Sequence, residues 1–222
     1  MKWLVKKNIL ISALVLFLLF AIYLAFSWGN SYVLVKQPHQ LMLQWGTKKK
    51  TFSTKSWKIA ASQMQMAVHA NPTNAQYVYN LARLYEWAAH QKPIFHKQAI
   101  TLRTQAIQHF ITALQLRPTW PQAWANLAMS KTLNLEFGDE VKMALANAMN
   151  YGVWEKGVFH KVIWISFINW NSLPKALKTQ IEQRIKETVT SKGQVPQYIQ
   201  QTANRFNWQN KLKKIINSKV SK

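Results

Sequence analysis

Cysteine is absent from this chain of 222 residues, and only six glycines occur in it. Without thiols the protein has no disulfide framework, no cysteine nucleophile and no cysteine metal site. The absence is compatible with an oxidising compartment but does not establish one. The scarcity of glycine leaves little room for a glycine-rich loop that cradles phosphate. Several large classes of enzyme and nucleotide-binding protein are therefore disfavoured from the outset.

Acidic residues are also scarce. Seven Asp and Glu stand against 29 Lys and Arg, so the formal net charge is +22. Such a balance predicts attraction to polyanions, namely anionic lipid head groups, acidic polysaccharide or nucleic acid. The last part of the chain, 175–222, carries eleven basic and two acidic residues. A lysine-rich composition without functional meaning would give the same balance, and both interpretations stay open at this point.

Sequence patterns of catalysis and metal binding are missing as well. The chain has no HExxH motif, no hint of a Ser-His-Asp order and no Cys/His cluster. Acidic residues ahead of a helix usually stabilise its N-terminus, and three carboxylates here lie at such a turn. We therefore expect no catalytic residue, no metal, no cofactor and no enzymatic activity; a hydrolase would need a pocket with perturbed carboxylates. The side chains considered are Glu86, Glu136, Asp139, Glu140, His90, His96 and His109.

The N-terminal region contains one long apolar run. Residues 9–26 include Ser12 as the only polar residue, and a helix needs ~20 apolar residues to span a bilayer. Three lysines precede the run, and Trp28 and Tyr32 follow it at the level expected for a membrane interface. We expect residues 1–30 to form a membrane anchor.

A cleaved signal peptide is the alternative interpretation of the same run. The triplet at 25–27, Ala-Phe-Ser, resembles a cleavage site, but the run is longer than the ~7–15 residues of a typical signal sequence. The lysines before the run place the N-terminus in the cytoplasm. The expected location is a bacterial inner membrane, with a single span and a periplasmic C-terminal domain, so nucleic acid is not an expected partner.

Two stretches, 71–85 and 117–128, share a pattern that begins at a proline and continues into Asn-Leu-Ala. In each, a large residue precedes a leucine by one helical turn, as Val78 precedes Leu81 and Trp124 precedes Leu127. Counting back from each proline also gives small, large and small residues on one stripe. These stripes are Ala60, Met64 and Ala67 before Pro72, and Ala106, Phe110 and Ala113 before Pro118.

This pattern resembles tetratricopeptide repeats, which pair helices in a stacked array. The middle repeat is stretched by twelve residues, EWAAHQKPIFHK, which predict a longer first helix, a stop at Pro93 and a loop that offers a contact surface. The expected fold is all-α: a transmembrane helix, a tetratricopeptide-like α-solenoid and extra C-terminal helices. The expected segments are an anchor at 1–30, a linker or capping segment at 31–56, repeats at 57–152, a helical extension at 153–217 and a frayed tail at 218–222.

In tetratricopeptide proteins the first helix of each pair lines the concave face, and the resemblance places such a face on two segments. The candidate partner-binding groove consists of Gln76, Tyr79, Asn80, Arg83, Trp87, Gln122, Asn126 and Met129. Most of the other tryptophans are expected in the core, although exposed aromatic rings beside basic residues would suit sugar rings. These expected core residues, with Trp87, are Trp120, Trp154, Trp164, Trp170 and Trp208.

The runs LYEWAA, ALQLRPTWPQAWANLAMSK, GDE and YGVWE, with Trp170 a helix later, are similar to those of VpsP-like polysaccharide-biosynthesis proteins. The likeness covers about residues 60–190. These are small, membrane-anchored proteins with tetratricopeptide-like repeats, encoded with exopolysaccharide genes. The resemblance implies a non-enzymatic scaffold that binds a partner protein of an exopolysaccharide or envelope polysaccharide machine. Two alternatives stay open: an electrostatic binder of acidic glycan or anionic lipid, and an assembly factor for cytochrome maturation or pili.

Overall fold

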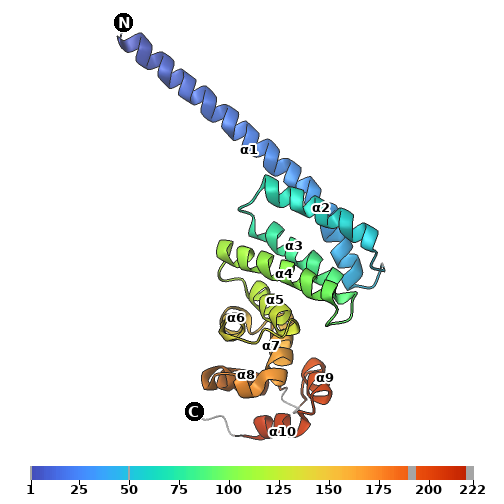
Figure 1. The fold of residues 1–222 in the computed structure, drawn as a ribbon. Coiled ribbons are helices and arrows are strands. Elements are labelled where there is room, and N and C mark those ends of the chain that lie inside the picture. Colours follow the sequence, from blue (N-terminus) through green and yellow to red (C-terminus); the bar gives the residue numbers. More distant parts are fainter. Residues whose placement is uncertain (1, 50, 190–193, 219–222) are drawn as a thin grey trace. The chain divides into compact units, whose positions relative to one another are not determined.

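The computed structural model describes residues 2–49, 51–189 and 194–218. These residues form α-helices, one short 3-10 helix and connecting loops, and no strand occurs among them. The expectation of an all-α protein is therefore confirmed. The chain divides into two compact units, residues 1–84 and 85–222, with the boundary inside helix α3 (Figure 1).

Helix α1, Lys2–Gly46, holds the apolar run of the first unit (Figure 1). The large apolar side chains from Leu10 to Phe26 are exposed along it, except that of Leu24, which is half-buried. In the described part of the chain, α1 is the one helix long and apolar enough to cross a membrane, and a signal sequence near an N-terminus has the same properties. The length and composition of α1 thus fit a membrane anchor.

Helix α1 does not end after the apolar run. We expected a linker or capping segment over 31–56, but the helix continues to Gly46 and only a short connection precedes α2, Thr54–Ala70. The reason is a buried stripe on α1, formed by Ser31, Pro38 and Trp45 at seven-residue spacing, together with Leu41. This spacing places all of them on one face of a helix, which packs against α2.

Helix α2 packs against α1 and carries a buried stripe of its own. Ala60, Met64 and Ala67 are fully buried, as their four- and three-residue spacing predicts. At the end of α2 the carbonyl of Ala70 accepts a hydrogen bond of 2.9 Å from the Ser27 hydroxyl on α1. The hairpin of α1 and α2 therefore begins directly where the exposed apolar run ends, and Figure 1 shows α2 alongside the C-terminal half of α1.

Helix α3, Ala75–His90, follows in the first unit up to Leu84. The side chain of Asn74 accepts a hydrogen bond of 3.0 Å from the backbone N–H of Gln76, which caps the start of the helix. Val78 and Leu81 are buried, in agreement with the repeat pattern. The indole N–H of Trp57 on α2 donates to the carbonyl of Leu84 at 2.8 Å and ties the two helices together.

The second unit continues with seven α-helices in its described part. Helix α5 packs against α4, α6 and α7, so it lies at the centre of this group. Contact between α5 and both α6 and α7 is typical of stacked helical hairpins, whereas the tetratricopeptide-like solenoid itself stays a prediction. The elements are α4 Lys97–Leu116, α5 Pro121–Leu133, α6 Asp139–Gly152, α7 Lys156–Asn169, the 3-10 helix η1 Trp170–Ser172, α8 Lys175–Thr188, α9 Gln197–Arg205 and α10 Gln209–Asn217.

The twelve-residue insertion forms the end of α3 and the loop that leads into α4. Arg103 of α4 is buried and holds this loop by donating to the carbonyl of Ile94. Its Nε also donates to the Asn134 side chain at 2.6 Å. Phe95 at the loop remains exposed. The loop is thus fixed to its scaffold while presenting an apolar surface.

The last helices pack through aromatic rings. Phe167 of α7 stacks on Trp208, with ring centroids 4.1 Å apart. The ammonium of Lys211 lies over the rings of both Trp170 and Trp208, at 4.4 and 4.1 Å. In its described part, the expected helical extension at 153–217 consists mainly of α7 to α10 and η1. Of the expected tail at 218–222, all but the first residue lie outside the described part.

Candidate functional site

The eight residues of the predicted groove divide between the two units, four in each. In the first unit the Gln76 amide donates to the Asn80 side chain at 2.9 Å, and the Arg83 guanidinium donates to the Tyr79 hydroxyl at 3.4 Å. Tyr79 and Asn80 are buried. Gln76 and the half-buried Arg83 are therefore the members that a partner could reach.

In the second unit the other four predicted residues have different environments. Asn126 is buried, and Trp87 and Met129 are half-buried. The Gln122 amide donates to the carboxylate of Glu155, which lies just ahead of α7. Gln122 thus helps to fix the α6–α7 turn. The groove as a single surface stays a prediction.

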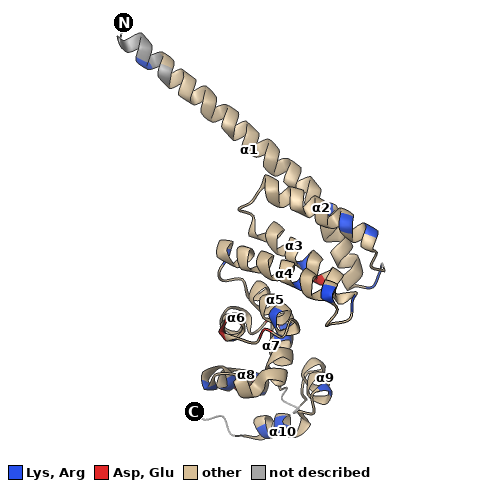
Figure 2. Ribbon diagram, in the orientation of Figure 1, with Lys and Arg blue, Asp and Glu red and all other residues tan. Residues whose placement is uncertain are grey.

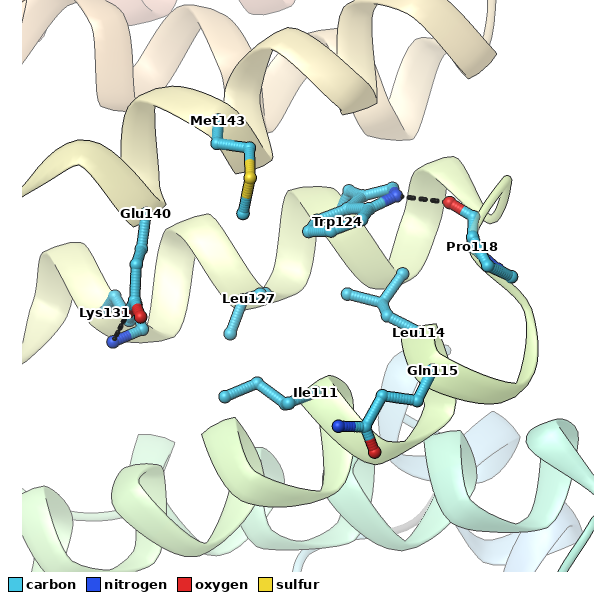
Figure 3. A pocket seen from close by; sticks show the side chains of 9 residues that line it. All are labelled: Ile111, Leu114, Gln115, Pro118, Trp124, Leu127, Lys131, Glu140 and Met143. Atoms are coloured by element: carbon cyan, nitrogen blue, oxygen red, sulfur yellow. Dashed lines mark hydrogen bonds and ion pairs between the residues drawn. The ribbon is translucent and has the colours of Figure 1, made fainter.

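A well-defined apolar hollow lies between α4, α5 and α6, and we call it the α4–α6 groove (Figure 3). Its volume is about 340 Å³. Side chains from all three helices point into it, with Ile111 on α4, Leu127 on α5 and Met143 on α6. The full lining is Ile111, Leu114, Gln115, Pro118, Trp124, Leu127, Lys131, Glu140 and Met143.

Trp124, the large residue one helical turn before Leu127 in the repeat pattern, is half-buried and lines this groove. Its indole N–H donates to the carbonyl of Pro118 at 2.6 Å (Figure 3). The polar edge of the ring is thereby satisfied, and the ring contributes an apolar wall. Met143 at the rim is 52% exposed, so the groove is open to an apolar side chain from outside.

Charged side chains at the other end of the groove form ion pairs. The Lys131 ammonium lies 3.0 Å from the Glu136 carboxylate and 2.7 Å from that of Glu140. Burial by itself would lower the pKa of Lys131, but its hydrogen bonds to Glu140 and Glu136 and their charges outweigh this and raise it. Asp139 pairs with Lys142 at 2.8 Å. The carboxylates of this turn are held in ion pairs, an arrangement that stabilises structure.

The remaining carboxylate and the histidines singled out by sequence also have structural partners. Glu86 is buried and accepts a hydrogen bond of 3.0 Å from the Ser130 hydroxyl. His90 and His96 contact backbone groups near the inserted loop. His109 stacks on a tyrosine ring, and burial lowers its pKa. Among the described residues no group of three His, Asp or Glu side chains could hold a metal ion.

A second hollow lies between the α6–α7 turn, α7, α8 and α9, and we call it the α7–α9 cavity. Its volume is about 570 Å³, and Val153, Trp154, Lys156, Phe159, Arg184, Pro196, Gln197, Tyr198 and Gln201 line it. Trp154 is 67% exposed, so the expectation that it belongs to the core is wrong. The turn between two helices directs this ring outward, whereas Trp120 and Trp170 are buried as expected.

The two runs that carry the family resemblance meet beside this cavity. Pro121, from RPTWPQAWANLA, packs so closely on Gly152, from YGVWE, that a Cβ at Gly152 would overlap the proline ring. Gln122 and Glu155 add the hydrogen bond between the same runs. Residues far apart in sequence thus build one junction between α5 and the α6–α7 turn.

Sequence reasoning missed most of the cavity. Lys156, Arg184 and Tyr198 come from three different helices, and no local spacing connects them. A usable signal was the segment GVWEKG, in which a tryptophan and a lysine stand at a turn between two glycines. Lys and Arg also occur on each of α8, α9 and α10 (Figure 2).

A scan against protein-family models and a search of curated proteins found no match for the chain. The likeness to VpsP-like proteins therefore rests on the quoted runs alone.

Proposed function

We propose that the protein is a membrane-anchored helical scaffold that binds a partner protein. The observation that carries this proposal is the continuity of α1, whose exposed apolar run leads without a loop into the hairpin with α2. A scaffold fixed in this way holds its helices beside the bilayer surface. It has no need of chemistry of its own.

Retention of the apolar run, as opposed to cleavage, fits the packing of the hairpin. Cleavage after the 25–27 triplet would remove Ser27, whose hydroxyl bonds to Ala70 at the end of α2. It would also cut through a continuous helix. Lysines ahead of the run orient the N-terminus to the cytoplasm. The proposed location is accordingly a bacterial inner membrane with the helical units in the periplasm.

The α4–α6 groove supplies a surface for the partner. Lys131 is already balanced by two glutamates, so the groove favours an apolar side chain over an anionic one. Three of the seven acidic residues of the chain, Glu136, Asp139 and Glu140, lie at this turn. They stand against the two lysines that pair with them, Lys131 and Lys142, so one negative charge is in excess. The occupant we propose is an amphipathic helix of another membrane protein, with apolar residues in the groove and a basic residue near the turn.

The pathway is a further part of the proposal and rests on the family resemblance. An exopolysaccharide or envelope polysaccharide machine would supply the partner, for example a glycosyltransferase, a polymerase or a flippase. Assembly of cytochromes or pili is the alternative for the same scaffold. The identity of the crosslinked partner separates these cases.

Photocrosslinking in intact membranes tests the scaffold function. A photoreactive residue in place of Met143 should crosslink the full chain to a membrane protein, whereas the same residue in place of Thr101, exposed on α4 outside the groove lining, should not. Mass spectrometry then identifies the partner. Equal products from both positions would contradict docking in the groove. Unchanged amount and chain length of envelope polysaccharide after gene deletion would contradict the pathway.

A further inference from the structure

We propose that the α7–α9 cavity binds an acidic sugar unit of a glycan chain through Trp154, Lys156 and Arg184. The proposal concerns a different surface from the α4–α6 groove, and it stands on the side chains of the cavity whatever partner the scaffold binds. Its basis is the combination of an exposed aromatic ring, two cations and several neutral hydrogen-bonding groups around one open space.

The aromatic part is Trp154, at the turn between α6 and α7. Its side chain is 67% exposed, although tryptophan is highly buried on average in proteins. Burial against other parts of the described chain therefore does not account for its position. The face of an indole ring offers a flat apolar surface, and the C–H groups of a sugar ring fit such a surface.

Two cations line the same cavity. Lys156 is exposed, and no carboxylate in the described part of the chain forms an ion pair with it. Arg184 pairs through one nitrogen with Glu187 at 3.3 Å, while its buried Nε has no hydrogen-bond partner among the described residues. The guanidinium of Arg184 lines the cavity, and its terminal N–H groups, as distinct from the buried Nε–H, match a carboxylate in geometry.

Neutral groups on α9 complete the lining. Gln197 and Gln201 are exposed and offer amide donors and acceptors for sugar hydroxyls. Tyr198 lies between them, and the Lys156 ammonium is 5.8 Å from its ring centroid. Burial raises the pKa of Tyr198, while the charge of Arg184 opposes this shift only in part. The phenol thus stays protonated and remains a hydrogen-bond donor at neutral pH.

The composition of the lining indicates binding without cleavage. Hydrolysis of a glycosidic bond ordinarily needs two carboxyl groups at the scissile bond, and the nine lining residues include none. A phosphate of a lipid head group would use the two cations as well. Exposed tryptophan also suits a membrane interface, so the reason for favouring a sugar is the pair of amides from Gln197 and Gln201, which match the several hydroxyl groups of a sugar.

Calorimetric titration tests the proposal on the full chain in nanodiscs of phosphatidylcholine. The probe is a short oligogalacturonate, and a neutral malto-oligosaccharide of equal length is the control. Binding of the acidic probe alone is expected. Trp154→Ala and Lys156→Gln should each weaken it by about tenfold, the usual loss for one hydrogen bond to a charged group or a comparable contact.

Lys175→Gln is the matched control variant, because it removes one exposed lysine of α8 that does not line the cavity. It should leave the affinity unchanged. Equal losses in Lys156→Gln and Lys175→Gln would overturn the proposal in favour of diffuse charge attraction. Tighter binding of glycerol phosphate than of the oligogalacturonate, insensitive to Trp154→Ala, would overturn it in favour of a lipid head group. The crosslinking experiment at Met143 probes the other groove, so the two proposals fail independently.

Discussion

The α4–α6 groove and the α7–α9 cavity each contain one tryptophan and at least one cation, yet these residues are used in opposite ways. In the groove the indole N–H of Trp124 bonds to a backbone carbonyl, and Lys131 is held by two glutamates. In the cavity the ring of Trp154 is largely exposed, and Lys156 forms no ion pair in the described part of the chain.

The type of a residue therefore does not by itself determine its role in these hollows. A tryptophan or a lysine whose polar groups bond to other parts of the protein lines a hollow and stabilises the fold. The same residue with free surface is available to a ligand. The groove therefore suits an apolar segment of a protein, and the cavity suits an anionic molecule with a flat face.

Gly152→Ala should destabilise the second unit by about 1–3 kcal/mol, the usual range for forcing extra atoms into a packed site. The new Cβ would overlap the ring of Pro121, which joins the start of α5 to the turn beside the cavity. Chemical unfolding of the full chain in detergent measures the change. Gly152 ends α6, the helix that carries Met143, and precedes Val153 of the cavity lining, so the variant should also impair both the Met143 crosslink and glycan binding.

Gly157→Ala is the matched control for that variant. Nothing lies within 4 Å of the position of its Cβ, and the residue is the second of α7. Replacing a glycine in the first turn of a helix by alanine should stabilise the protein by up to about 0.5 kcal/mol, less than in a helix interior. Equal destabilisation by the two substitutions would show that the close approach at Pro121 is not the cause.

Lys131→Gln should lower the free energy of unfolding by about 1 kcal/mol, because it leaves two neighbouring glutamates without their shared cation. Lys156→Gln should change it by less than about 0.5 kcal/mol, since an exposed lysine outside any ion pair contributes little. Parallel denaturation curves of the two variants test this difference. Equal losses would mean that Lys156 is also structural, and would remove the contrast between the hollows.

Acidification should destabilise the second unit. Burial lowers the pKa of His109 from its ordinary value of 6.5, and the pKa of His160 is also lowered. Both imidazoles therefore bind protons more readily in the unfolded chain than in the folded one. The free energy of unfolding is at its full value above the pKa that the imidazoles have in the unfolded chain, and it decreases as the pH falls through that pKa. Unfolding curves at pH 7.5 and pH 5 measure the loss. His109→Gln should reduce the pH dependence, and an unchanged slope would contradict this assignment.

The smallest effect should be a shift in the pKa of His160, whose ring contacts Tyr198 beside the cavity. Burial lowers this pKa most, and the charges of Lys161 and Lys156 lower it further. Lys156→Gln should therefore raise it, because one repulsive charge is removed. Titration of the imidazole resonances by NMR measures the shift. Lys175→Gln serves as control. An equal rise of the His160 pKa in that variant would show that the effect of Lys156 does not depend on its position beside His160.

Much of the fold could be predicted from local patterns. The spacing of Ala106, Phe110 and Ala113 predicts a buried helical stripe, and all three are fully buried. The extension of α1 was missed because Ser31 and Pro38, which lie on its buried face, do not stand out as apolar residues in the sequence. A serine and a proline become part of a packed face only when a second helix covers them.

The candidate sites were less accessible to sequence reasoning. Gln122 was expected in a groove but is engaged by Glu155, a partner thirty-three residues away. Trp154 was assigned to the core because tryptophans are usually buried, and only the turn geometry shows that its ring faces outward. Sites formed by several helices depend on contacts between residues distant in sequence, and periodicity carries no information about these.

Helix α1 also has a mechanical consequence. After the apolar run, α1 continues over residues 27–46, which is twenty residues or about 30 Å at the rise of an α-helix. With no flexible joint at residue 27, this part of the helix is a lever arm. In the proposed membrane-anchored state, a change of about 20° in the tilt of the apolar run, within the range seen for membrane helices, would swing the far end of the hairpin sideways by about 10 Å. Because bilayer thickness affects the tilt of a membrane helix, it would also affect the position of the far end of the hairpin.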